Sequence, residues 1–415
     1  MASTIQHQCR ISGRGGRAYS AALALLIALV AGVVCLPSVQ AQTFSVLYTF
    51  TGGTDGSNPY AGLIQDKSGN LYGTTYQGGS SSCGGGAGCG VVFKVDTSGH
   101  ETVLYTFTGP PDGANPYGGL VMDSSGNLYG TTYVGGASAF GSVFKVDSSG
   151  HETVLYSFTG GTDGANPRAG LIRDAAGNLY GTTVGGGADG DGTVFKLDSS
   201  GNESVLHSFA GYPKDGAGPF GGLIRDAAGA FYGTTNAGGH YGPGTVFKLD
   251  KAGNETVLYS FANGADGGRP RPGVIRDTAG NLYGTTKNGG VGGPGTNCAL
   301  YGCGVVFKVS KAGKETVLYS FTGTGGDGLG PWARLVQDGA GNLYGTTLSG
   351  GTNGGGTVFK LDNTGKETVL HSFVGSTDGA HPYAGLIMDS AGNLYGTTYN
   401  GGPSNGHGTV FMIAP

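Results

Sequence analysis

The sequence predicts an all-β protein folded as a seven-bladed β-propeller with four strands in each blade, and three observations support this. The phrase LYGTT or a close variant recurs seven times, four strand-like runs accompany each copy, and the 89 glycines fall mainly between those runs. Repeats of about 50 residues built from four short strands are typical of propellers. The sequence therefore predicts one ring-shaped domain over residues 42–415.

The LYGTT copies align along the whole chain. Consecutive copies lie 57, 51, 52, 51, 61 and 51 residues apart. They begin at Leu71, Leu128, Leu179, Phe231, Leu282, Leu343 and Leu394. Within residues 170–209 one unit reads GLIRD, NLYGTT, GTVFKLD and SVLHSF, which are four runs of strand length. Each unit is expected to form one blade.

The connections inside a unit are of two kinds. Compact turns such as DAAGN and DSSGN join the first run to the second and the third to the fourth, with Asp bonding local backbone and Gly allowing a positive φ. The other connections are longer and glycine-rich, such as VGGGADGD. Because alternate connections of a propeller emerge on opposite faces, all long loops are expected on one side. We call this side, around the channel mouth, the long-loop face.

The two ends of the repeat region complement each other. A lone strand-like run, SVLYTF, occupies residues 45–50, whereas the last unit ends after its third run, GTVFMI. We predict that the N-terminal strand pairs near Val410, completes the last blade and closes the ring. Closure removes the free sheet edges at which aggregation would begin.

Residues 1–41 have the three-part pattern of a secretory signal peptide. Three arginines precede an apolar run at residues 21–36, and cleavage is expected after Ala41. The alternative is a retained membrane anchor, but the run is shorter than the roughly 20 apolar residues of a spanning helix. The sequence therefore predicts a secreted protein, extracellular or periplasmic, with no membrane insertion after cleavage.

Composition excludes one class of partner. Charged residues make up 12% of the chain and the net charge is -4, which provides no electrostatic basis for binding nucleic acid. The expected partner is an extracellular glycan or protein, and the chain itself is expected to be a monomer.

Four cysteines lie in pairs within the loops that lengthen two repeats. Cys83 and Cys89 separate the second and third runs of the first unit, and Cys298 and Cys303 do so in the fifth. Four cysteines allow three pairings, but the first and fifth blades are not neighbours in a ring of seven blades. We therefore expect Cys83–Cys89 and Cys298–Cys303 disulfides. Zinc binding is the competing interpretation, and separation across the ring disfavours it.

The repeat also resembles a known bacterial family. Units such as DSSGNLYGTTYVGG and GANPRAGLIRDAAGNLYGTT are similar to the GloVer tandem repeat of exported bacterial proteins, and more distantly to NHL-type propeller blades. The resemblance covers residues 44–413. It implies the fold and export, and it provides no activity, ligand or site residue to transfer.

Recurring aspartates are interpreted as turn residues. The Asp of the DG pair in each unit, for example Asp163, is expected to cap its own loop, and the Asp that ends the first run, for example Asp174, to shape the hairpin. Calcium is the alternative, but one carboxylate per blade supplies too few of the about six to eight oxygens that calcium binds. No metal site or cofactor is predicted, and calcium is left open.

Positions that vary while their surroundings repeat are better candidates for recognition. One such position directly follows the loop proline, where the chain enters the innermost strand at the rim of the channel. Its residues are Tyr60, Tyr117, Arg168, Phe220, Arg271, Trp332 and Tyr383. Aromatic faces offer stacking surfaces for sugar rings, and arginine binds carboxylates or sulfates bidentately. We predict that these residues, the rim ring, bind the ligand on the long-loop face.

All arginines after residue 41 lie in the innermost run or directly before it. They are Arg168, Arg173, Arg225, Arg269, Arg271, Arg276 and Arg334. A central cationic zone on a slightly acidic protein favours an anionic ligand. The alternative for Arg173, Arg225 and Arg276 is that they form ion pairs at the far end of the strand.

No catalytic motif is found: the chain lacks a nucleophile elbow, a metal-binding histidine pattern and a phosphate loop. Enzymatic activity is left open, with none favoured and no catalytic residue assigned. The leading hypothesis is an exported, non-enzymatic module that binds an extracellular glycan or protein. The alternatives are a secreted polysaccharide lyase or glycoside hydrolase acting on uronate-rich polymers, and a structural surface or matrix protein.

Overall fold

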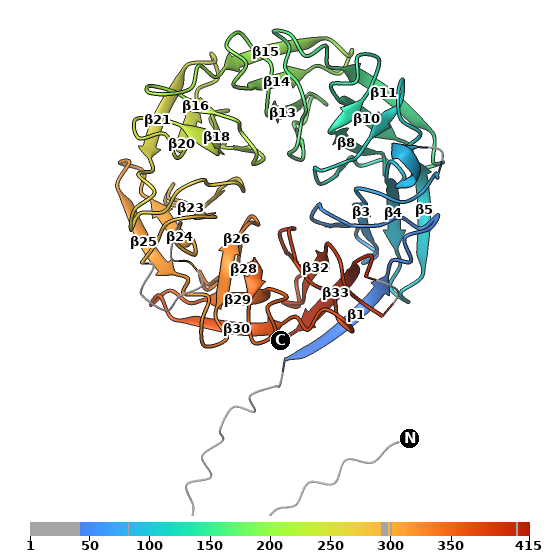
Figure 1. Ribbon diagram of the computed structural model, residues 1–415. Helices are drawn as coiled ribbons and strands as arrows, with labels where there is room; N and C mark the ends of the chain where they lie inside the picture. Colours follow the sequence, from blue (N-terminus) through green and yellow to red (C-terminus); the bar gives the residue numbers. More distant parts are fainter. Residues whose placement is uncertain (1–41, 82, 292–297, 299–300, 404–405) are drawn as a thin grey trace, which may run out of the picture. The chain divides into compact units, whose positions relative to one another are not determined.

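The computed structural model describes residues 42–415 except 82, 292–297, 299–300 and 404–405. Seven antiparallel sheets are arranged as the blades of one ring (Figure 1); six have four strands, and in the seventh a loop strand adds to the four blade strands. The predicted seven-bladed β-propeller is thus confirmed. The signal peptide expected at residues 1–41 lies outside the described residues. In the described part of the chain, no helix has the length and apolar character needed to cross a membrane.

Each blade contributes one strand to each of four concentric rings. The innermost strands are β2 (Ile64–Gln65), β7 (Val121–Met122), β12 (Ile172–Arg173), β17 (Ile224–Arg225), β22 (Ile275–Arg276), β27 (Val336–Gln337) and β31 (Ile387–Met388). The second strands are β3 (Leu71–Thr74), β8 (Leu128–Thr132), β13 (Leu179–Thr183), β18 (Phe231–Thr235), β23 (Leu282–Thr286), β28 (Leu343–Gly350) and β32 (Leu394–Thr398).

The two outer rings follow the same order. The third strands are β4 (Val91–Val95), β10 (Ser142–Val146), β14 (Thr193–Leu197), β20 (Thr245–Leu249), β24 (Val305–Val309), β29 (Thr357–Leu361) and β33 (Thr409–Ala414). The outermost strands are β5 (Glu101–Thr106), β11 (Glu152–Ser157), β15 (Glu203–Ser208), β21 (Glu255–Ser260), β25 (Glu315–Ser320), β30 (Glu367–Ser372) and β1 (Thr43–Thr49).

Short elements decorate the loops. Pairs of loop strands are β6 (Gly113–Ala114) with β9 (Val134–Gly135), β16 (Gly216–Ala217) with β19 (Ala237–Gly238), and β26 (Gly328–Pro331) with β28. One 3-10 turn, η1 (Gly84–Gly86), lies between the first two loop cysteines.

Strand β1 closes the ring by pairing antiparallel with β33. Tyr48 lies opposite Val410, as the sequence predicted, and Thr43 lies opposite Ala414. The last blade therefore takes its outermost strand from residues 43–49 and its inner three strands from residues 387–414 (Figure 1, blue beside red). The third strand of the last blade, β33, is therefore paired on both sides like the third strands of the other blades.

The apolar core lies between adjacent blades. A phenylalanine of each third strand packs edge-on against a phenylalanine that follows the outermost strand of the preceding blade, with ring centroids 5.0 to 5.2 Å apart. The pairs are Phe50–Phe93, Phe107–Phe144, Phe158–Phe195, Phe209–Phe247, Phe261–Phe307, Phe321–Phe359 and Phe373–Phe411. Such pairs contribute about 0.5–1.5 kcal/mol beyond the area they bury. Each unit therefore repeats both phenylalanines because each contacts a different neighbour.

The glycine of LYGTT makes room for this packing. In β13, Gly181 lies opposite Phe195 of β14, and a Cβ at Gly181 would come 2.6 Å from the Phe195 ring. A larger residue would displace the ring that forms the contact between blades. The motif thus repeats for a steric reason.

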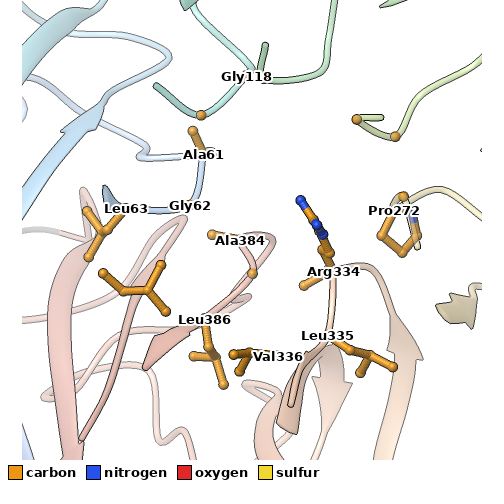
Figure 2. Close-up of a pocket in the computed structure, with 18 of the residues that line it drawn as sticks. Ala61, Gly62, Leu63, Gly118, Pro272, Arg334, Leu335, Val336, Ala384 and Leu386 are labelled. Carbon is orange, nitrogen blue, oxygen red and sulfur yellow. The ribbon is translucent and has the colours of Figure 1, made fainter. Parts of the chain in front are cut away.

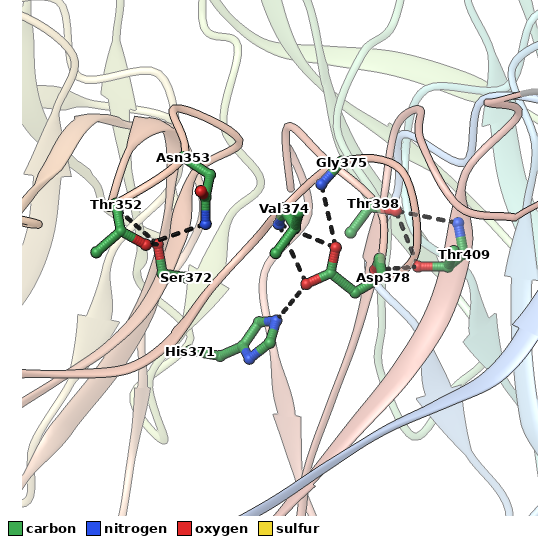
Figure 3. A network of polar contacts seen from close by, with 9 residues as sticks. All are labelled: Thr352, Asn353, His371, Ser372, Val374, Gly375, Asp378, Thr398 and Thr409. Atoms are coloured by element: carbon green, nitrogen blue, oxygen red, sulfur yellow. Dashed lines mark hydrogen bonds and ion pairs between the residues drawn. The ribbon is translucent and has the colours of Figure 1, made fainter.

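The DG aspartates have the turn role that the sequence predicted. Asp378 accepts a hydrogen bond from the backbone N–H of Gly375 and lies 2.8 Å from Nε2 of His371 (Figure 3). His207 pairs with Asp215 in the same way at 3.1 Å, and in the other five blades a tyrosine takes this place; the Tyr156 hydroxyl donates to Asp163 at 3.0 Å. The carboxylate therefore ties the outermost strand to the loop entering the next blade. Among the described residues, no three His, Cys, Asp or Glu side chains form a group suited to a metal.

The aspartate that ends each innermost strand shapes the following hairpin. Asp174 accepts hydrogen bonds from the backbone of Asn178 and from the Tyr180 hydroxyl at 3.0 Å. Partial burial opposes ionisation, but these hydrogen bonds outweigh it and lower the pKa of Asp174. The Tyr180 ring also packs against Leu223 and Phe231 of the next blade. The repeated tyrosine therefore serves both the hairpin and the contact between blades.

Both predicted disulfides are present. Cys83 is bonded to Cys89 and Cys298 to Cys303, with Cα atoms 5.5 and 5.1 Å apart. All four cysteines are buried and belong to the apolar clusters between blades. The bonds therefore extend the core into two of the long loops.

Candidate functional site

The innermost segments line the channel with three successive rings of residues, because residues two apart in an extended segment face the same side. The rim ring comes first. Next is the glycine belt, which consists of Gly62, Gly119, Gly170, Gly222, Gly273, Arg334 and Gly385. Below it is the aliphatic ring, formed by Ile64, Val121, Ile172, Ile224, Ile275, Val336 and Ile387. A cavity of about 740 Å³ is lined by the rim ring, the belt and five of the aliphatic residues. Figure 2 shows part of this lining, with Gly62 and Arg334 of the belt and Val336 of the aliphatic ring.

All seven predicted rim residues meet at the mouth of this cavity, and the aromatic ones contact one another. The Tyr60 ring stacks on Tyr383 with centroids 4.5 Å apart and meets the Tyr117 ring edge-on at 4.2 Å. Trp332 contacts Tyr383 at 5.3 Å. These four residues form a continuous aromatic arc, each half-buried and open to the cavity.

Two arginines complete the rim ring. The guanidinium of Arg168 lies 4.7 Å from the centroids of both the Tyr117 and Phe220 rings. The guanidinium of Arg271 lies 4.9 Å from Phe220 and 4.0 Å from Trp332. Each arginine is thus held between two aromatic rings by cation–π contacts, and its Nε is buried without a hydrogen-bond partner. No described carboxylate neutralises either charge.

The sequence analysis missed a second ring of residues that supports the first. The position directly after LYGTT carries Tyr76, Tyr133, Val184, Asn236, Lys287, Leu348 and Tyr399. Tyr76 contacts Tyr117 at 4.8 Å, Tyr399 contacts Tyr383 at 5.2 Å, and Lys287 Nζ lies 5.1 Å from the Trp332 ring. Like the rim position, this position varies beside a constant motif, so the same criterion would have identified it.

The mouth is chemically divided. Tyrosines gather on one side, and burial together with neighbouring Tyr76 raises the pKa of Tyr117 to about 12, although Arg168 lowers it, so the phenol stays protonated at neutral pH. Cations gather on the other side. Burial, followed by the charges of Arg271 and Arg269, lowers the pKa of Lys287. The cations therefore repel one another, and a bound anion would reduce this repulsion.

Arg269 adds to this cluster from a strained backbone position. The residue before the loop proline has a positive φ in every blade, and Asn or Gly fills it in five of them. Arg269 has φ 54°, which a long side chain adopts at a conformational cost. Despite this cost, Arg269 adds a positive charge close enough to lower the pKa of Lys287.

Unlike the rim arginines, the arginines at the far end of the innermost strands contact the preceding blade. Arg225 lies 3.7 Å from Asp174 and its guanidinium lies 5.3 Å from the Tyr180 ring, both on the preceding blade. Arg173 and Arg276 stack in the same way, each 5.6 Å from a tyrosine ring of the preceding blade. These three residues therefore join neighbouring blades.

The chemistry of the cavity follows from its lining. Its titratable side chains among the described residues are arginines and tyrosines, with no aspartate, glutamate or histidine. The arrangement offers aromatic faces, phenol hydroxyls and cations to a ligand. It offers no carboxylate pair for acid–base catalysis.

Comparison with known proteins gives a family and a fold. The family model of the Gloeobacter/Verrucomicrobia repeat matches residues 28–174, 82–298 and 296–415. No curated protein matches the chain.

Solved structures with a similar fold include two extracellular domains from B. thetaiotaomicron. The extracellular domain of a one component system is 11% identical to this chain, with a TM-score of 0.57, and the match covers 89% of this chain and 40% of that one. The extracellular domain of a hybrid two component system is 14% identical, with a TM-score of 0.56, and the match covers 90% of this chain and 41% of that one. A gluconolactonase of Xanthomonas campestris is 13% identical, covering 90% and 89%, and its TM-score of 0.43 carries no argument. The chain thus spans about two fifths of the two extracellular domains, and the likeness concerns the fold alone.

Proposed function

The chain belongs to the Gloeobacter/Verrucomicrobia repeat family, and from this premise we propose that it is an exported, non-enzymatic β-propeller that binds an extracellular glycan at its channel mouth. The closed rim ring is the observation that carries the proposal. Seven side chains from seven blades meet around one cavity of about 740 Å³, within the range of about 300–1,000 Å³ usual for ligand sites.

The rim ring suits a sugar because it combines flat aromatic faces with hydrogen-bonding groups. Tyr60, Tyr383 and Trp332 present half-buried rings whose contacts with one another restrict their movement. A ring that is already held in place loses little conformational entropy when it binds. A purely structural protein would have no need for this concentration of aromatic and cationic side chains around one cavity.

The cavity lining favours binding over hydrolysis. Most glycosidases need two carboxyl groups about 5 to 10 Å apart, and the described lining has none. A lyase needs a base, and burial of the rim tyrosines raises their pKa, which disfavours phenolate. We therefore assign no catalytic residue.

Export is supported by the two disulfides, since such bonds persist in oxidising compartments. Residues 1–41 serve as the cleaved signal peptide in this proposal, and residues 42–415 form the mature monomer in the periplasm or outside the cell.

The proposal is tested with purified residues 42–415 by affinity electrophoresis in gels containing neutral or uronate-rich polysaccharides. Retardation by at least one polysaccharide is expected, and Trp332→Ala and Tyr383→Ala should each weaken it about tenfold or more. Tyr241→Ala is the matched control, because Tyr241 is 61% exposed and does not line the cavity.

The same mixtures are assayed for new reducing ends and for unsaturated products. Product formation would contradict the non-enzymatic part of the proposal. Retardation by no polysaccharide would overturn it in favour of a protein partner or a structural role.

A further inference from the structure

Arg334 occupies a position at which every other blade has glycine. Along the glycine belt the innermost segments approach one another backbone to backbone; a Cβ at Gly170 would lie 2.8 Å from the carbonyl oxygen of Gly119. At this level of the channel, six blades therefore have no side chain, and the seventh has the long side chain of Arg334. Arg334 extends from its segment into the open cavity, away from Leu335 and Val336 (Figure 2).

The charge of Arg334 has no partner among the described residues. Its side chain is accessible to water, and no hydrogen bond or ion pair joins its guanidinium to another described group. Apolar side chains of the aliphatic ring, such as Ile275 and Ile387, form the next level of the channel. Protein walls surround the cation on several sides, and an anion brought close to it would be attracted more strongly than in bulk water.

Two further cations stand above Arg334 at the rim. Arg271 is on the preceding blade at the next level up, and Arg168 is two blades further round. Both are held by aromatic rings, so their terminal N–H groups need no protein carboxylate to orient them. The cavity therefore concentrates positive charge in a protein whose net charge is -4.

We infer that the cavity binds the carboxylate of an acidic sugar, with the carboxylate descending through the glycine belt to Arg334 and the sugar ring remaining among the rim aromatics. This inference rests on the proposed function and names the chemistry of its ligand. The belt glycines line the cavity without placing a side chain in it, and Arg334 supplies a planar donor pair that matches the two oxygens of a carboxylate. Arg168 and Arg271 add charge at the entrance.

The test compares two probes of the same sugar skeleton by isothermal titration calorimetry. Oligogalacturonate carries the carboxylates, and its fully methyl-esterified form lacks the charge. The decisive variant is Arg334→Gly, which restores the residue present in the other six blades and so preserves the repeat. Arg173→Gln is the matched control, because it removes one positive charge outside the cavity and introduces the residue found at the same position in two other blades.

The native chain is expected to bind oligogalacturonate more tightly than the ester, and R334G is expected to lose roughly 10- to 100-fold in affinity for the acid alone. R173Q should leave both affinities unchanged. Equal binding of acid and ester by native chain and R334G would overturn this inference while the proposed function stands. Binding of neither probe would overturn this inference, whereas the proposed function falls only if no polysaccharide retards the chain in the gels. Tighter binding of a sulfated dextran oligomer than of the uronate would overturn the assignment to a carboxylate.

Discussion

Phe44 of β1 stacks on His371 of β30, with ring centroids 3.7 Å apart and ring planes 6° from parallel. This contact joins the last two blades at the seam where the ring closes. The outermost strands of the other six blades begin with glutamate at the place of Phe44. In the last blade, an aromatic contact therefore stands where the other six blades have a glutamate carboxylate.

Removing that contact is expected to weaken closure. Phe44→Ala should lower the free energy of unfolding by about 2 kcal/mol, because Phe44 is half-buried and a fully buried phenylalanine costs about 3–5 kcal/mol to truncate. Urea denaturation measures the change. Phe140→Ala, at a side chain that is 42% exposed, serves as the control with a smaller expected loss. Equal losses in both variants would contradict a special role for the seam.

Deleting residues 42–51 should destabilise the whole domain in one cooperative step. The deletion removes β1 and Phe50, which leaves β33 unpaired on one side and opens the contact between Phe50 and Phe93. An open edge also templates aggregation. Calorimetry and light scattering would show a lower melting temperature and more aggregation than in residues 42–415. An unchanged melting curve would argue against closure by β1.

Stability is expected to fall as pH rises from about 4.5 to 7. Six glutamates begin the outermost strands, namely Glu101, Glu152, Glu203, Glu255, Glu315 and Glu367. Burial, followed by a nearby aspartate, raises the pKa of each to about 7, from an ordinary value of 4.5. Since the folded-state pKa lies above the unfolded one, the associated stability is complete below pH 4.5 and is lost as pH rises through 7.

Glu152 provides the variant for this pH dependence. Its Oε1 is buried without a hydrogen-bond partner, and its main charged neighbour is Asp112. Glu152→Gln should be more stable than the native chain at pH 8 by on the order of 1 kcal/mol, a value reduced because water screens a partly exposed carboxyl. Urea unfolding at pH 5 and pH 8 measures it. If the variant lost as much stability between these pH values as the native chain, Glu152 would not be the source.

Ligand binding should change the fluorescence of Trp332. Trp332 is the only tryptophan of the chain, and it lies 4.0 Å from the Arg271 guanidinium and 5.1 Å from Lys287 Nζ. A ligand that contacts the rim ring alters the polarity around the indole and shifts its emission. Titration of the free protein and of Arg271→Ala should give different starting spectra and different midpoints. An emission spectrum insensitive to a ligand bound by calorimetry would place that ligand elsewhere.

Much of the molecule could be predicted before its structure was known, because the relevant information is local and repeated. The spacing of LYGTT predicts the blades, the lone run SVLYTF predicts the closing strand, and the paired cysteines predict both disulfides. The rim ring was also found in this way, since every unit reaches the channel at the same point of its repeat.

By itself, the sequence determined which residues occupy equivalent places in the seven blades, because equivalence follows from periodicity along the chain. Only the tertiary structure decided which of them touch. The pairing of Arg225 with Asp174, the support of Trp332 by Lys287, and the isolation of Arg334 within the glycine belt all involve different blades. Such contacts join residues about 50 positions apart in the sequence, and their distances depend on how closely neighbouring blades approach around the closed ring.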